Sequence, residues 1–204
     1  MLTRREVFGL VPATLAARAA SPQANVTVPV DILFDKDAKL SDDTVRRFWA
    51  LWAEAARDFG WCGVFFQTRV RDAGMWRPPH RPPVIAGLGE RVLNLVVTNS
   101  IPLEWDLTRT VRGVTTMYRG HHLCLVAMNN AGRHRVPLIA VNTCVHELLH
   151  ALLLDVFEQR PEGARGQARE FRVDWLATRL WLFHAGGGIR ESARVYAERL
   201  RAGQ

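Results

Sequence analysis

Residues 144–154 read Cys-Val-His-Glu-Leu-Leu-His-Ala-Leu-Leu-Leu, and His146, Glu147 and His150 interrupt this otherwise apolar run. Four residues of α-helix turn by about 400°, so the two imidazoles project from one face of a helix, a turn apart. Burying two imidazoles and a carboxylate is costly unless a partner satisfies them. The stretch therefore predicts a buried helix that presents a polar cluster to a single ligand.

The spacing of these three residues is that of a helical zinc site. Both histidines can bind one Zn²⁺, while Glu147 lies near the metal but outside its coordination sphere. From there its carboxylate can take a proton from a water that zinc has made acidic. The structural alternative is a pair of partly buried histidines beside an exposed glutamate. We expect a catalytic zinc site with His146 and His150 as ligands and Glu147 as the general base.

A catalytic zinc also needs a third protein ligand, for which the chain offers several candidates. Asp155 follows the motif closely but points to another face of the helix, and His134 precedes the motif in an arginine-flanked loop. Glu170 and Asp174 are four residues apart on the next expected helix, so they face the same way. His184 lies about 21 Å beyond Glu170 along a helix, so these two cannot share an ion. Spacing alone does not select one ligand.

Two segments together resemble a known family. The combination of His146-Glu147-x-x-His150 with Glu170-x-x-Val173-Asp174-x-Leu176-Ala177 resembles the gluzincin branch of the zincin metallopeptidases. The metzincin pattern does not fit, because Leu153 and Val156 stand where it has glycine and histidine.

In the gluzincin branch the third ligand is a glutamate on the following helix, and an acidic residue four positions later hydrogen-bonds a ligand histidine. The resemblance therefore implies Glu170 as the third ligand and Asp174 as the residue that orients His146 or His150. The alternatives are a solvated helix residue for Glu170 and an exposed partner of neighbouring arginines for Asp174.

The resemblance covers about residues 137–184 and also implies a fold and an activity. In a zincin-like fold a small mixed sheet packs on the active-site helix, and an edge strand, expected within residues 113–128, pairs with extended substrate. The implied activity is zinc-dependent hydrolysis of a peptide or protein substrate. A His, Tyr or Arg outside the motif stabilises the oxyanion in such enzymes, and the His121-His122 pair could instead be an accessory metal site or simply an exposed pair at a turn. The candidates for the oxyanion role are Tyr118, His121, His122, His184 and Tyr196.

The order of expected elements predicts one α+β domain over residues 21–204, with a sheet in its N-terminal half and C-terminal helices. Ser41 is a suitable N-cap for the first helix. Residues 72–90, rich in proline and glycine, are expected to form a surface loop. Strands are expected at residues 26–34, 64–70, 92–98, 113–117 and 123–128, and helices at residues 42–59, 138–155, 167–184 and 189–202.

Residues 1–20 have the composition of an export signal, with Arg4 and Arg5 before a short apolar stretch that ends in small residues. Residues 3–8 resemble the twin-arginine signal, with one residue inserted before Phe8. The alternative is an amphipathic helix of a cytosolic protein. We expect a signal peptide and a periplasmic or secreted mature chain. Such a compartment permits a disulfide, and Cys62 with Cys124 is the expected pair.

Composition excludes several classes of protein. A chain that is 48% hydrophobic and 23% charged is not disordered. No apolar run approaches the roughly 18–20 residues that cross a bilayer, so no membrane span is expected in the mature chain. The net charge is +7, but all basic residues except Lys36 and Lys39 are arginines, a bias that genome composition can produce. Without interleaved aromatic residues, this charge does not predict a nucleic-acid partner.

Two other functions fit the same residues. One is a catalytically inactive zinc-binding envelope protein that serves as a partner-binding module. The other is a cationic envelope-binding module in which the motif is coincidental. Glu147 favours catalysis over the first alternative, because a metal site alone does not require it.

Overall fold

The computed structural model describes residues 24–76, 84–101, 113–129, 133–136, 139–153, 173–174, 176–177 and 188–204. The N-terminal half contains β1 (Val26–Asp35), η1 (Lys36–Ala38), α1 (Asp42–Trp61), β2 (Val64–Trp76), β3 (Val84–Ala86) and β4 (Leu93–Thr98). The C-terminal half contains β5 (Gly113–Tyr118), β6 (His121–Ala127), β7 (Arg133–Val136), β8 (Ile139–Asn142), α2 (Thr143–Leu152) and α4 (Gly188–Ala202).

Six of the strands form one curled mixed sheet in the order β3-β2-β1-β4-β6-β5. The strands β2, β1, β4 and β6 run parallel, while β5 lies antiparallel to β6 at one edge and β3 lies antiparallel to β2 at the other. β7 and β8 form a separate antiparallel pair. This arrangement confirms the predicted mixed α and β architecture. The sheet is not confined to the N-terminal half, because β5 and β6 from the C-terminal half belong to it.

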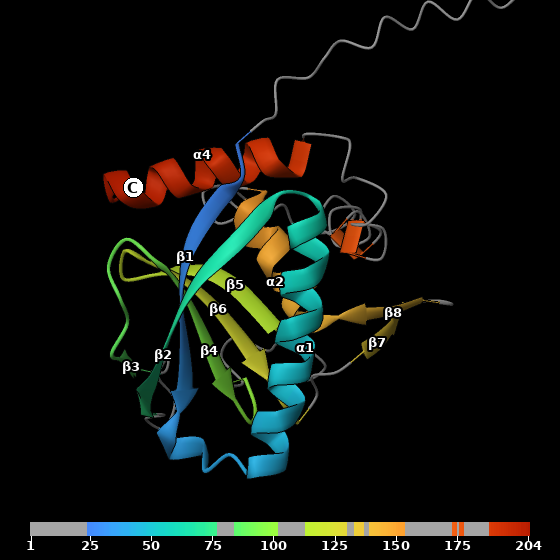
Figure 1. Cartoon of the computed structure of the whole chain (residues 1–204). Helices are drawn as coiled ribbons and strands as arrows, with labels where there is room; N and C mark the ends of the chain where they lie inside the picture. The colour runs from blue at the N-terminus through green and yellow to red at the C-terminus, as the bar shows by residue number, and fades with distance from the viewer. Residues whose placement is uncertain are drawn as a thin grey trace, which may run out of the picture.

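The main core lies between the sheet and the helices α1, α2 and α4, which cover one face of it (Figure 1). On α1, Phe48, Trp52, Ala55 and Phe59 recur at helical spacing and are buried. Ser41 caps this helix, since its side chain accepts a hydrogen bond from the backbone N–H of Thr44. The apolar stripe read from the sequence is therefore the face that packs on the sheet.

The opposite face of the sheet curls around a second, smaller core. Leu33, Met75, Ile85 and Leu125 belong to this cluster. The curl brings the two edge strands close to each other. The backbone N–H of Ile85 in β3 donates a hydrogen bond to the hydroxyl of Tyr118 in β5, at 3.3 Å. The right-handed twist of the strands accumulates across the sheet and contributes to this curl.

The predicted start of the helix that carries the motif is wrong. The sequence predicts a helix from residue 138, but β8 occupies residues 139–142 and α2 begins at Thr143. The side chain of Asn142 caps α2 by accepting from the N–H groups of Cys144 and Val145. The apolar run from Ile139 to Val141 suits either state, and its pairing with β7 decides for a strand.

The predicted surface loop over residues 72–90 is also wrong in part. β2 continues to Trp76, and β3 pairs with its end. Buried Ala73, Met75 and Ile85 hold these segments on the smaller core. Residues 77–83, where the prolines gather, lie outside the described residues.

The expected disulfide between Cys62 and Cys124 is wrong: both are buried and carry a thiol that forms no disulfide, as does Cys144. Cys62 lies just before β2, and Cys124 lies on β6, three strands further across the sheet. At about 4.8 Å per strand this is roughly 14 Å, too far for a disulfide. Burial raises the pKa of Cys62 to about 11 and that of Cys144 to about 12.

The last predicted helix is confirmed as α4. Of the helix predicted over residues 167–184, the described residues 173–174 and 176–177 are helical, and the rest lies outside the described part of the chain. Residues 1–23, which contain the expected signal peptide, are also outside it. Among the described helices, none is long and apolar enough to cross a membrane.

Candidate functional site

The motif residues lie on α2, a helix whose ten residues are all buried. α2 packs between the sheet strands β5 and β6 and the helices α1 and α4. His146 is 9% exposed, Glu147 4% and His150 5%. Three polar side chains thus occupy an environment where each needs a partner.

The two imidazoles meet as the four-residue spacing predicts. The Nε2 atoms of His146 and His150 are 3.0 Å apart, and the ring centroids are 4.7 Å apart at an interplanar angle of 68°. The two Nε2 atoms therefore lie within hydrogen-bonding distance of each other.

Asp174 completes this arrangement from the helical segment that follows. Its Oδ1 lies 2.8 Å from Nδ1 of His146. Val173 and Leu176 beside it are buried in the main core, which places the carboxylate against α2. When Nδ1 carries a proton it donates that proton to this carboxylate, and the lone pair of a neutral ring is then on Nε2, the atom nearest His150.

The third ligand is not settled by the described residues. Glu170, Asp155 and His184 lie outside them, and of His134 only the backbone is described, in β7. Within the described part of the chain, no group of three or more His, Cys, Asp or Glu side chains could hold a metal ion. Glu170 as third ligand stays a prediction.

Glu147 faces the edge strand β5. Its Oε2 accepts a hydrogen bond of 2.6 Å from the hydroxyl of Thr115, and its carbonyl oxygen lies 3.0 Å from the same hydroxyl. The thiol of Cys124 also donates to this carbonyl, at 3.7 Å. The Thr115 hydroxyl has one proton, and its shorter contact is the one to the carboxylate. A Cβ at Gly113 would overlap the Glu147 side chain. β5 therefore determines where this carboxylate lies.

The sequence analysis missed Gly113 and Thr115. The available signal was a strand that opens with glycine and places threonine two residues later on the same face, beside a helix with a buried carboxylate.

We expect Thr115→Val to lower the free energy of unfolding by about 1–3 kcal/mol, because it leaves a buried carboxylate without its donor. Thr115→Ser keeps the hydroxyl and serves as the matched control. Urea denaturation of the two variants checks this, and equal stability of Thr115→Val and wild type would contradict it.

The candidates for an oxyanion role have other partners. His122 bonds through Nδ1 to the hydroxyl of Tyr196 at 3.1 Å and through Nε2 to the carbonyl of Gln204 at 2.8 Å. Burial lowers the pKa of His122 and raises that of Tyr196, so both are neutral at pH 7. The Nδ1 of His121 contacts the carbonyl of Gly89. Tyr118 bonds to β3, as described above, and His184 is outside the described residues.

The sequence predicts that His121 and His122 form either an accessory metal site or an exposed pair at a turn. The structure fits neither interpretation for the two residues together. Adjacent residues of β6 point to opposite faces of the sheet, so the two rings cannot chelate one ion from the same side. His122 is 4% exposed, which also excludes an exposed pair.

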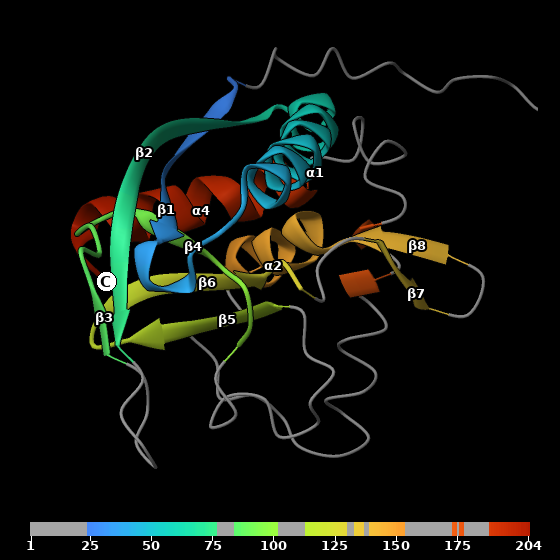
Figure 2. The same cartoon turned by 90° about the horizontal axis from the view of Figure 1, so that it is seen from below.

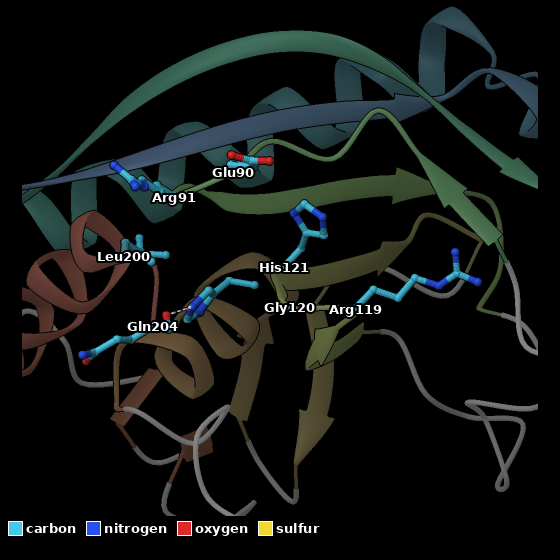
Figure 3. Close-up of a pocket in the computed structure, with 9 residues that line it drawn as sticks. Glu90, Arg91, Arg119, Gly120, His121, Leu200 and Gln204 are labelled. Carbon is cyan, nitrogen blue, oxygen red and sulfur yellow. Dashed lines mark hydrogen bonds between the residues drawn. The ribbon is translucent and has the colours of Figure 1, made fainter.

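A polar cavity of about 340 Å³ lies at the end of β6 where His121 stands (Figure 3). Arg91 and Arg119 line it, but in Figure 3 their side chains point to opposite sides rather than toward a common centre. None of the three motif residues lines this cavity.

A comparison of the chain with known protein families, curated proteins and solved structures finds no significant match.

Proposed function

We propose that this protein is a zinc-dependent metallopeptidase of the zincin type. The observation that carries the proposal is the approach of the His146 and His150 Nε2 atoms to 3.0 Å, with the other nitrogen of His146 held by Asp174 at 2.8 Å. This is the arrangement of a ligand pair oriented by a carboxylate.

The donor set fits zinc. Imidazole nitrogens bind Zn²⁺ at about 2.0–2.1 Å, so two nitrogens this close together can share one ion. The Asp174 carboxylate supports the tautomer of His146 in which Nε2, the atom nearest His150, carries the lone pair that zinc would accept. Glu170 would be the third ligand, which leaves one position open for water or substrate.

The placement of β5 supports a peptide as substrate. β5 is the last strand of the sheet and the only antiparallel partner of β6 among the described strands, and it lies beside α2. An extended peptide that pairs with its outer edge would run past Glu147, which contacts Gly113 and Thr115 of the same strand.

Each residue then has a defined task. Bound zinc would polarise the scissile carbonyl and lower the pKa of a water molecule. Glu147 takes a proton on its carboxylate and delivers it to the leaving nitrogen. Thr115 holds one carboxylate oxygen, and Asp174 holds the His146 ring. The buried surroundings of α2 exclude bulk water from these groups.

We also propose that the mature protein acts in the periplasm or outside the cell. The support is the twin-arginine-like sequence of residues 1–20 alone.

Zinc content tests the proposal. The full chain should bind about one zinc ion, His146→Ala and His150→Ala should each lose it, and Glu170→Gln should weaken binding about ten- to a hundredfold. His121→Ala is the matched control, because it removes a histidine outside the site and should retain zinc. Atomic absorption of the folded variants measures this, and a peptide library measures hydrolysis. Zinc retained by both motif variants would refute the proposed site.

A further inference from the structure

The strand β2 has a long edge that pairs with nothing in the described part of the chain. Its residues Val64–Ala73 pair with β1 on one side, but β3 pairs only with Gly74–Trp76 on the other. Figure 2 shows β3 beside the end of β2 alone. The N–H and C=O groups along such an edge are available to another strand.

This edge is exposed and carries apolar side chains. Residues 67–72 are exposed on both faces of the sheet. Phe65 and Val70 are 45% and 55% exposed, and together with Trp61 they are the large exposed hydrophobic residues of the described chain. β2 contains no proline, the residue that most effectively blocks pairing at an edge.

Charged side chains at a sheet edge commonly prevent pairing with another strand, but the arginines of β2 are directed away from its unpaired edge. The Nε of Arg69 bonds to the fully buried Asp31 of β1 at 2.8 Å, and Arg71 bonds to the other oxygen of the same carboxylate. Both guanidinium groups therefore lie toward β1 rather than beyond the free edge. Asp31 also offsets part of their charge, which lowers the repulsion between two copies of this edge.

The edge is complementary to itself in one antiparallel register. With Thr68 opposite its own copy, Phe66 faces Val70 of the second copy on the helix-covered side. On the other side Phe65 faces Arg71, and Gln67 faces Arg69. Apolar residues thus meet each other on the helix-covered side, and no two arginines stand directly opposite each other. A register centred on Arg69 would instead oppose two arginines.

We propose that two copies of this chain associate through β2, antiparallel and with a two-fold axis at Thr68, so that the sheet continues across the dimer. A single strand pair buries less area than a standard interface, so we expect a weak, reversible dimer. This inference depends on no part of the proposed zinc site.

A charge exchange at Thr68 tests the register. The side chain of Thr68 is exposed, so Thr68→Lys and Thr68→Glu should each fold normally, as circular dichroism and thermal melting check. Each places like charges opposite each other at the axis and should weaken self-association at least about tenfold. An equimolar mixture opposes lysine to glutamate and should restore the dimer. Sedimentation velocity of the full chain up to about 200 μM measures this.

The same exchanges at Ala50, an exposed residue of α1, are the matched controls and should leave the dimer unchanged. A wild-type chain that stays monomeric overturns the proposal. A dimer that both Thr68 variants leave intact, or that the mixture fails to restore, also overturns it, because the contact then lies elsewhere.

Discussion

Replacing Glu147 by glutamine is expected to lower peptide hydrolysis by about a thousandfold while zinc content stays unchanged. The amide has the size of the carboxylate and can still accept a hydrogen bond from Thr115, but it cannot take a proton from water. Because Glu147 is adjacent to a ligand without being one in this proposal, the metal site should persist. Steady-state hydrolysis of a responsive peptide, with zinc measured on the same sample, checks both parts.

Glu198→Gln makes the same chemical change on the exposed side of α4, where Glu198 bonds to Arg194, and should not affect hydrolysis. If Glu147→Gln stays active, the assigned base is wrong. If the wild-type chain binds zinc but cleaves no peptide in the library, the inactive zinc-binding protein is the better description.

Replacing Gly113 by alanine is expected to lower hydrolysis by about a hundredfold without loss of the fold. The new Cβ would overlap the Glu147 side chain, which would have to leave its place beside β5. A displacement of about 1 Å in a catalytic group commonly costs this much. Kinetics with zinc analysis separate a displaced base from a lost metal.

Gly188→Ala is the matched control, since a Cβ at Gly188 meets nothing within 4 Å. It should leave hydrolysis unchanged. Full activity of folded Gly113→Ala would mean that β5 does not hold Glu147 in its working position.

Local sequence predicted the elements whose periodicity is strong. The apolar stripe and serine cap of α1, the strands β1, β4, β5 and β6, and α4 were all expected close to their observed positions. The meeting of His146 and His150 follows from helical geometry alone, because residues four apart share a face wherever the helix lies.

Elements that depend on a partner strand were predicted less well. The run before α2 is apolar enough for a helix, and β2 runs into a segment rich in glycine and proline. In both places, pairing with a distant strand decided the structure. Propensity over a few residues does not contain that information.

By itself, the sequence determined a pair of imidazoles on one turn of a buried helix, since helix geometry is local. Only the tertiary structure decided which groups meet them: Asp174 comes to His146 from 28 residues away, and Thr115 comes to Glu147 from 32 residues away. The same holds for the separation of Cys62 from Cys124 and for the free edge of β2. These depend on the order of strands in the sheet, which the packing of the whole chain selects.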